Sequence, residues 1–316
     1  MHPAENRIER ADGVTRVDLA ELIALRARAG KPLTQPAHHR IPLAGGHVSA
    51  LRGRGMDYAE SRIYQTGDDV RNIDWRRTAR SGKWHTKLFQ AERERALLLL
   101  LDTHATMRFG TRVRYKSVAA ARAAAWLAWG CVRGGDRVGA MAFGNVRAAV
   151  DPQAGTRGAL GVLGAIARWD GQAQVAAADA AEPLSAALDR ARRMAPPGSQ
   201  VWLLSDGWCV DAAATHALAR LARHAELRAV VLADPLEQAL APPGSYVFET
   251  PAGKQRVALM DATARTGLRD RLAHGWRGLT AACDAAAVPW VLQVTSAEPD
   301  ACLTPLWRAR SRRRRA

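Results

Sequence analysis

The sequence predicts an α/β protein built on a doubly wound, mostly parallel sheet, with a β-containing N-terminal extension before it. Residues 96–101 form a continuous apolar run that ends at Asp102, a pattern typical of a parallel strand buried on both faces. Strand-like and helix-like segments then alternate along the chain, as they do in such sheets. With 316 residues and a hydrophobic content of 48%, the chain is long enough to bury a substantial core.

The first 95 residues divide into two predicted segments. Residues 1–40 are expected to form a polar, flexible lead followed by a helix, because apolar residues recur at helical spacing over residues 17–29 and Gly30 is a stop signal. Residues 41–95 are punctuated by glycine and contain short alternating runs. This pattern predicts a β-rich segment with a strand at residues 84–89.

Residues 96–295 carry the alternating pattern of the sheet domain. Helices are predicted at residues 116–133, 156–169, 183–194, 211–223 and 263–287, the last interrupted near Gly275. Strands are predicted at residues 96–101, 136–143, 146–150, 200–204, 227–232 and 289–294. An insertion near residues 235–260 is expected to hold a β-hairpin around Gly253. Residues 296–316 are predicted to form a basic, disordered tail.

The chain carries a formal net charge of +16, and six arginines fall within residues 308–316. Such a charge fits nucleic acid, an anionic surface or an acidic protein partner. Neither a signal-peptide pattern nor an apolar run of bilayer length occurs, so we expect no membrane span and a cytoplasmic location. The four cysteines are not spaced for a zinc or redox motif, and we expect reduced, packed thiols.

Acidic residues close two of the predicted parallel strands, Asp102 and Asp206. Ligands of open α/β sheets bind at this edge, so the two carboxylates are expected to meet there. In the loop after the first strand, alternate residues would bring His104 and Thr106 to the same spot. Carboxylate and hydroxyl oxygens suit Mg²⁺, whereas imidazole does not. The alternative is a polar loop in which Asp102 bonds neighbouring amides.

This arrangement resembles the metal-ion-dependent adhesion site of von Willebrand factor A domains, which has an Asp-x-Ser-x-Ser motif, a later Thr and a later Asp. Asp102 and Asp206 match the two Asp positions, and Thr106 replaces the second Ser. His104 replaces the first Ser, and Glu182 stands near the place of the Thr. The resemblance therefore implies a degenerate metal site, with Mg²⁺ as the candidate ion and no small-molecule cofactor.

A longer signature precedes this site. Its members are Arg62, Tyr64, Gly67, Asp68, Asp69, Arg71, Asp74, Trp75, Arg76 and Arg80. The signature resembles that of the DUF58 family, bacterial proteins with a von Willebrand A-like core. The resemblance implies a partnership with a MoxR-type AAA+ ATPase. From the residues alone, the mixed charges predict either an ion network with Trp75 packed under it or a docking surface for an acidic partner.

We found no phosphate-binding loop, nucleophile elbow or His-Glu-x-x-His motif in the sequence. The expectation is therefore a non-enzymatic protein–protein interaction or scaffold protein that assists the assembly or maturation of other proteins. Two alternatives stay open. One is a protein that binds nucleic acid or an anionic surface through its basic charge. The other is a metal-dependent hydrolase that uses Asp102, Glu182 and Asp206.

Overall fold

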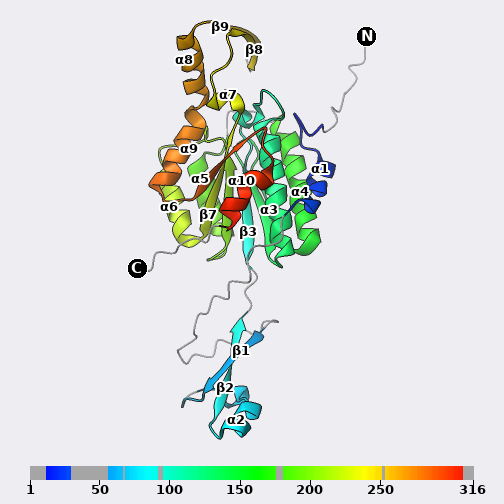
Figure 1. The fold of residues 1–316 in the computed structure, drawn as a ribbon, viewed down its shortest axis with the longest axis vertical. Helices are drawn as coiled ribbons and strands as arrows, with labels where there is room; N and C mark the ends of the chain where they lie inside the picture. Colours follow the sequence, from blue (N-terminus) through cyan, green and yellow to red (C-terminus); the bar gives the residue numbers. More distant parts are fainter. Residues whose placement is uncertain are drawn as a thin grey trace. The chain divides into compact units, whose positions relative to one another are not determined.

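The computed structural model describes residues 12–29, 56–66, 68–91, 95–175, 181–250 and 253–308 (Figure 1). The chain divides into two compact units. One comprises residues 34–94 and is called the signature unit below. The other combines residues 1–33 with residues 95–316 and is called the sheet unit. The predicted Gly67 lies outside the described residues.

The sheet unit contains a six-stranded sheet in the order β10-β7-β6-β3-β4-β5. All neighbouring strands run parallel except β5, which pairs antiparallel with β4 at the edge. The strands are β3 (Ala96–Asp102), β4 (Arg137–Phe143), β5 (Ala148–Ala154), β6 (Gln200–Ser205), β7 (Glu226–Ala233) and β10 (Trp290–Val294). The predicted doubly wound, mostly parallel sheet is confirmed. From β3 the chain first adds β4 and β5 on one side and then β6, β7 and β10 on the other.

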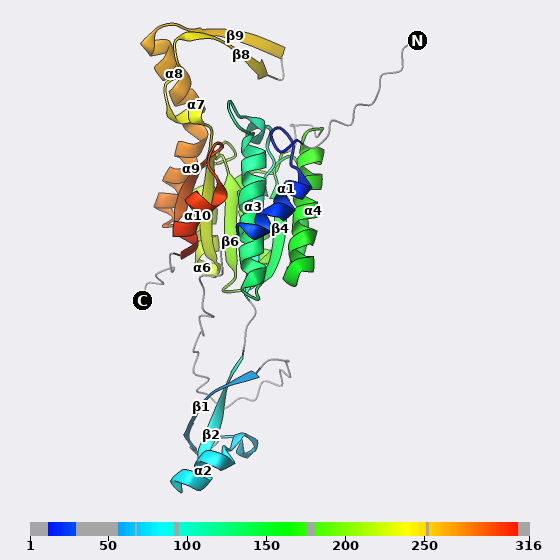
Figure 2. The same ribbon diagram turned by 45° about the vertical axis from the view of Figure 1, so that its right-hand side comes forward.

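Helices cover both faces of this sheet (Figure 2). One face is covered by α1 (Leu19–Ala24), its continuation as a 3-10 helix (Leu25–Ala27), α3 (Lys116–Arg133), α4 (Gly155–Ala173) and α10 (Pro299–Arg308). The other is covered by α5 (Leu184–Met194), α6 (Ala214–His224) and α9 (His274–Ala285). In α3, 15 of 18 residues are buried, because α1, α4 and α10 enclose it. Its alanines let these neighbours approach closely.

The insertion near residues 235–260 forms as predicted. It begins with α7 (Pro235–Gln238), continues as the antiparallel hairpin of β8 (Gly244–Thr250) and β9 (Gly253–Leu259), and returns through α8 (Ala262–Leu272). Figure 1 shows the hairpin and α8 extending beyond the sheet on the side of α7. The helix predicted over residues 263–287 is divided at Ala273, slightly before the expected glycines. Within the described residues, no helix has the length and apolar character needed to cross a membrane.

The prediction of a disordered tail from residue 296 onward is wrong for its first part. Residues Pro299–Arg308 form α10, in which Leu303 and Leu306 are buried. The Trp307 ring packs against Trp126 and Trp202, with ring centroids 5.9 and 5.8 Å apart. The apolar residues Leu303 and Leu306 precede the arginine run and are spaced for one face of a helix. Residues 309–316 lie outside the described residues.

Glu298, just before α10, joins three elements of the sheet unit. It accepts from Arg122 of α3 at 2.6 Å, from Arg28 after α1 at 2.7 Å and from Arg114 at 3.3 Å. Burial opposes its ionisation, but the charge of Arg122, reinforced by its neighbours, outweighs burial and holds the pKa of Glu298 below its ordinary value. The cluster therefore fixes the start of α10 against α1 and α3.

Replacing Glu298 with glutamine should lower the free energy of unfolding by about 1–2 kcal/mol at neutral pH, since three arginines lose a partly buried anion. A depressed carboxyl pKa stabilises the fold above the unfolded pKa. That stability disappears as the pH falls below the ordinary value of 4.5 and through the folded pKa. Urea unfolding at pH 7 and pH 3 measures both effects. The control is Asp189→Asn, which breaks an exposed pair with Arg220 and should cost under about 1 kcal/mol.

The signature unit contains β1 (Met56–Ile63), a 3-10 helix (Val70–Asn72), α2 (Trp75–Ser81) and β2 (His85–Ala91). β1 and β2 form an antiparallel pair, so the predicted strand near residues 84–89 is confirmed. Helix α2 was not predicted. Asp74 caps its first turn by accepting from the Arg77 amide, and Gly82 closes it at a φ of 66°, which glycine adopts without strain.

Candidate functional site

The predicted site lies where β3 and β6 end side by side. The register pairs Leu101 with Leu204, so Asp102 and Asp206 leave the sheet from neighbouring strands. A 3-10 helix (Ala105–Arg108) follows β3 and brings Thr106 over the strand end. Both carboxylates are buried, with relative exposures of 4% for Asp102 and 1% for Asp206. The predicted juxtaposition of Asp102, His104, Thr106 and Asp206 is therefore present.

Both carboxylate oxygens of Asp102 are already hydrogen-bonded within the protein. Oδ1 accepts from the His104 amide at 2.9 Å and lies 2.7 Å from the His104 Nδ1 atom. Oδ2 accepts from the Ser205 hydroxyl at 2.6 Å and from the Cys209 thiol at 3.3 Å. Burial alone would raise the pKa of Asp102, but the hydrogen bond and charge of His104 outweigh it and lower that pKa. Reciprocally, Asp102 raises the pKa of His104 against the opposing effect of burial.

Asp206 is neutralised by a buried lysine that sequence reasoning missed. The Lys116 Nζ atom donates to Asp206 Oδ2 at 2.7 Å and to Glu237 Oε1 at 2.9 Å. The Lys116 side chain is 1% exposed. Burial disfavours its charge, but Asp206 and then Glu237 outweigh burial and raise the pKa of Lys116. Burial raises the pKa of Asp206 and Glu237, and Lys116 opposes that rise.

Glu182 does not join the other candidate ligands. Its carboxylate pairs with Arg190, whose Nε atom lies 3.0 Å from Oε1, and it lies 3.7 Å from Arg147. It remains close enough to act electrostatically on His104. Thr106 does reach the site, since its hydroxyl donates to Asp206 Oδ1 at 3.4 Å.

This donor set does not fit a hard cation such as Mg²⁺. Such an ion needs free carboxylate oxygens and room for several waters. Here Lys116 supplies a positive charge to Asp206, and His104 and Ser205 occupy the oxygens of Asp102. Mg²⁺ would have to displace protein donors from both buried carboxylates, and it would gain little from the His104 imidazole or the Cys209 thiol in exchange. We therefore derive no chemistry through a magnesium ion at this position.

A further acidic residue extends the polar network across the strand ends. Asp234, after β7, accepts from the Thr111 amide at 2.9 Å and from the Thr295 hydroxyl at 3.0 Å. It also forms a capping box with Glu237 at the start of α7. Because Glu237 pairs with Lys116, the network links β6, β7 and the beginning of the insertion. Hydrogen bonds and ion pairs within the protein thus fix the carboxyl ends of these strands.

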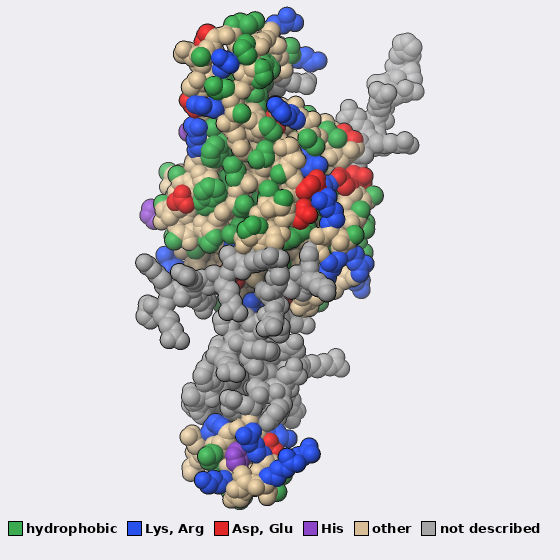
Figure 3. Space-filling view, in the orientation of Figure 1, with side chains coloured by type: hydrophobic (Ala, Val, Ile, Leu, Met, Phe, Trp, Pro, Cys, Tyr) green, Lys and Arg blue, Asp and Glu red, His purple; other side chains and the backbone are tan. Residues whose placement is uncertain are grey.

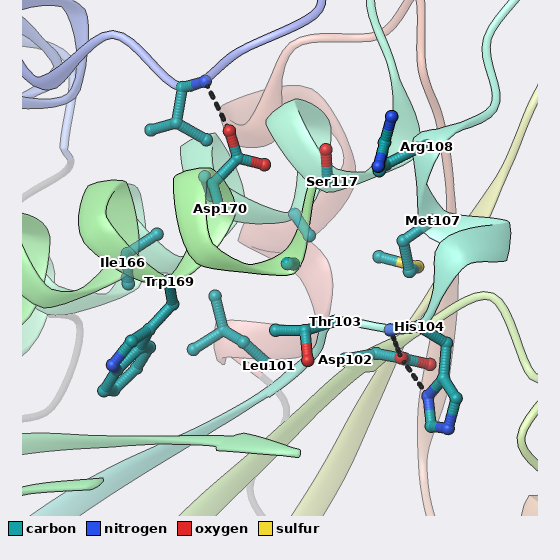
Figure 4. A pocket seen from close by; sticks show the side chains of 14 residues that line it. Leu101, Asp102, Thr103, His104, Met107, Arg108, Ser117, Ile166, Trp169 and Asp170 are labelled. Atoms are coloured by element: carbon teal, nitrogen blue, oxygen red, sulfur yellow. Dashed lines mark hydrogen bonds and ion pairs between the residues drawn. The ribbon is translucent and has the colours of Figure 1, made fainter. Parts of the chain in front are cut away.

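A pocket opens beside this network (Figure 4). It encloses about 420 Å³ of space, part of it open to solvent. Asp102, Thr103 and His104 line one side, while Trp169 and Asp170 of α4 line the other. Asp170 accepts from the Val17 amide at 3.0 Å, and burial raises the pKa of its carboxyl group. His104, whose side chain is 17% exposed, is therefore reachable from solvent.

Among the described residues of the signature unit, one ion pair of the predicted network is present. Arg62 binds Asp68 at 2.6 Å. Asp69 instead accepts from the Arg71 amide, and Asp74 accepts from the Arg77 amide at 3.1 Å and from the Ser61 hydroxyl at 2.6 Å. Both aspartates thus serve local backbone turns, a use that Asp favours at helix starts. The Tyr64 hydroxyl donates to the Asp68 carbonyl at 3.2 Å.

The prediction that Trp75 packs beneath a charge network is wrong. Trp75 is 64% exposed and Trp84 is 55% exposed, with their ring centroids 6.1 Å apart. Arg71, Arg76 and Arg80 are exposed as well, and Arg76 and Arg80 lie on the same side of α2 at i and i+4 spacing. Figure 3 shows Lys and Arg side chains gathered on the visible face of this unit. We call these five exposed side chains the Trp–Arg set.

Comparison with known proteins supplies a family and distant likenesses. Residues 60–277 match the family described as "Protein of unknown function DUF58". Over 99 residues the chain is 40% identical to uncharacterized protein Rv1480 of Mycobacterium tuberculosis and to uncharacterized protein Mb1516 of Mycobacterium bovis. The matched segment covers 31% of this chain and 31% of each relative, so it spans about a third of their length.

Two solved structures show lower similarity. An aerotolerance-related membrane protein from Bacteroides fragilis is 13% identical, with a TM-score of 0.38, covering 66% of this chain and 94% of that chain. A von Willebrand factor type A structure from Catenulispora acidiphila is 12% identical, with a TM-score of 0.35, covering 71% of this chain and 43% of that chain.

Proposed function

Because the chain belongs to the DUF58 family, with residues 60–277 matched, we propose that it is a non-enzymatic protein–protein interaction protein whose signature unit binds an acidic protein partner. The observation that carries this proposal is the exposure of two tryptophans, Trp75 and Trp84, on one small unit. The partner that the family resemblance implies is a MoxR-type AAA+ ATPase. The proposal includes assembly or maturation of other proteins as the outcome and the cytoplasm as the location.

The Trp–Arg set has the residue types that dominate binding energy at protein interfaces. Trp and Arg are enriched among residues whose loss costs more than about 2 kcal/mol of binding. Leaving two large rings in water costs solvation energy that a partner could recover by covering them. Ile63 and Val70, at 58% and 59% exposure, add apolar area in the same unit. The arginines favour a partner surface rich in Asp and Glu.

The strand-end network supports a role without catalysis. A catalytic carboxylate needs access to substrate and a proton affinity matched to its task. Asp102, Asp206 and Glu237 are instead saturated by protein donors at hydrogen-bond distance. Glu182, the third carboxylate of the hydrolase alternative, is held by Arg190. This network is better suited to fixing the shape of the sheet edge.

The test measures binding to a purified MoxR-type ATPase by calorimetry. Trp75→Ala with Trp84→Ala should weaken binding at least about 30-fold, corresponding to about 2 kcal/mol. Arg76→Glu with Arg80→Glu should weaken it further at low salt, because two positive charges become negative and face an acidic surface. Circular dichroism confirms that each variant remains folded.

The matched control for charge is Arg192→Glu with Arg193→Glu, two exposed arginines at the end of α5 in the sheet unit. This variant has the same net charge as the Arg76/Arg80 variant and should bind like the wild type. Equal losses in both variants would mean that net charge alone drives binding. Unchanged affinity in the tryptophan variant would remove the basis of the proposal.

The net charge of +16 favours one second candidate, binding to nucleic acid or another anionic surface. Counterion release would give a steep fall of affinity for duplex DNA with rising salt. Deleting residues 309–316 separates the contributions, because α10 ends at Arg308 and stays intact. If the truncated chain loses DNA binding but still binds the ATPase, residues 309–316 account for the DNA binding and the Trp–Arg set does not.

A further inference from the structure

Three side chains of different chemistry converge on one side of the strand-end network. Asp102 offers a carboxylate oxygen, His104 an imidazole nitrogen and Cys209 a thiol sulfur, and these atoms all lie within 4.8 Å of one another. Cys209 comes from the loop after β6, so the cluster joins two strand ends. The spacing of the cysteines along the sequence gave no sign of it.

Small side-chain movements would bring the cluster to tetrahedral distances around one metal ion, because His104 lies against Oδ1 of Asp102 and Cys209 against Oδ2. Zn²⁺ binds sulfur at about 2.3 Å and nitrogen or oxygen at about 2.0–2.1 Å, which places ligand atoms roughly 3.3–3.6 Å apart. The Cys209 sulfur already lies 3.3 Å from Asp102 Oδ2. The His104 Nδ1 atom lies 2.7 Å from Asp102 Oδ1, so the imidazole needs to move outward by less than an ångström on this estimate. His104 and Cys209 are both partly exposed, and His104 lines the pocket.

We infer that Asp102, His104 and Cys209 form a binding site for a borderline transition-metal ion of the Zn²⁺ class. Imidazole and thiolate are the ligands such ions favour over Mg²⁺. The Ser205 hydroxyl, 3.3 Å from the Cys209 sulfur, or a water molecule completes four ligands. Binding releases the thiol proton and any proton on the imidazole to solvent. One carboxylate, one thiolate and one neutral imidazole then balance the two charges of the ion.

This site shares Asp102 and His104 with the adhesion-type motif, but it differs from an adhesion-type magnesium site because Cys209 supplies a sulfur ligand. It uses neither Thr106 nor Asp206, whose carboxylate stays paired with Lys116 at 2.7 Å. Lys116 thus occupies the carboxylate of Asp206. The nitrogen of His104 and the sulfur of Cys209 lie on the other side of the network, next to Asp102. The inference also does not depend on the Trp–Arg set, so it can fail while the proposed partner binding holds.

The experiment titrates the full-length, untagged chain with Co²⁺ as a spectroscopic substitute for Zn²⁺. A cobalt–thiolate bond gives a sulfur-to-cobalt charge-transfer band in the near ultraviolet, and four-coordinate cobalt gives intense visible bands. We expect both to saturate at one ion per chain and to be displaced by Zn²⁺. Cys209→Ser should abolish the charge-transfer band. Losing an outer hydrogen-bond partner of a metal ligand weakens metal binding about 10- to 100-fold. His104→Ala removes a ligand itself and should weaken binding by more than that.

Cys283→Ser is the matched control, since Cys283 is a buried thiol of α9 outside the cluster. It should keep the band. If Cys209→Ser does not fold, alkylation of the wild type gives the same answer. Zn²⁺ should slow labelling of Cys209 and leave the half-buried Cys302 unchanged. Absence of a charge-transfer band in the wild type, a band that survives Cys209→Ser, or no protection of Cys209 would each overturn the inference.

Discussion

Replacing Lys116 with methionine is expected to lower the free energy of unfolding by about 3–5 kcal/mol at neutral pH. The Lys116 ammonium is the shared partner of Asp206 and Glu237, and all three side chains are at most 3% exposed. Methionine fills a similar volume but leaves two buried carboxylates without a counter-charge. Removing one partner of a buried ion pair is far more costly than losing an exposed pair.

The pH dependence of the stability loss in Lys116→Met shows whether the buried carboxylates cause it. Burial already raises the pKa of Asp206 and Glu237, and without Lys116 both should rise further. A raised carboxyl pKa means that the folded state binds more protons than the unfolded state, so stability falls as the pH rises. The deficit of Lys116→Met should therefore shrink as the pH is lowered from 7 towards the unfolded values near 4.

Urea unfolding of the wild type and of Lys116→Met between pH 4 and pH 8 measures this difference in stability. The control is Lys254→Met, which removes an exposed lysine of β9 and should change stability by less than about 0.5 kcal/mol. An equal loss at pH 4 and pH 8 would show that packing, and not the buried charges, accounts for the cost.

Replacing Gly207 with alanine is the second substitution expected to have a large effect, a loss of about 2–5 kcal/mol of stability. Gly207 follows Asp206 with a φ of 83°, which an L-residue adopts only with strain. An added Cβ would also meet the carbonyl of Gly275 and lie 2.6 Å from the Leu279 Cβ of α9. The backbone must then move, and with it the amide that donates to Ser205 at 3.0 Å.

Gly198 provides a close control, because it has the same φ of 83° but no atom within 4 Å of an added Cβ. Gly198→Ala should therefore cost only the backbone strain, about 1–2 kcal/mol. The difference between the two variants in thermal unfolding isolates the collision with α9. If the two losses are equal, the close approach of Gly207 to α9 contributes nothing to stability.

The sheet and the meeting of Asp102 with Asp206 were predictable, because an apolar run closed by an acidic residue is a local signal of a buried strand and its end. The partners of these carboxylates were not. Lys116 opens α3, where the helix dipole disfavours a cation. That misfit is the one sequence signal that its charge is compensated by tertiary contacts. Cys209 gave no signal, since only the turn after β6 brings it to Asp102.

The signature residues show a different limit of sequence reasoning, because a pattern visible in the sequence did not form the contacts expected of it. Its alternating charges predicted either an ion network or a docking surface, yet Asp69 and Asp74 bind backbone amides within a few residues. A local hydrogen bond to an amide requires less ordering than holding a long arginine side chain in place. Trp75 lies beside Trp84 and remains exposed. Composition alone does not distinguish these outcomes, because both use the same residue types.

The position of α1 has a consequence for how the chain folds during synthesis. Its partners are distant in sequence: the Leu22 carbonyl accepts from Trp129 at a separation of 107 residues, and Arg28 pairs with Glu298 at a separation of 270. These contacts close long loops, which raises contact order and slows folding. Helix α1 leaves the ribosome before α3, α4 and α10 but can dock fully only after these partners exist. We expect its amides to gain hydrogen-exchange protection last, after the sheet has formed.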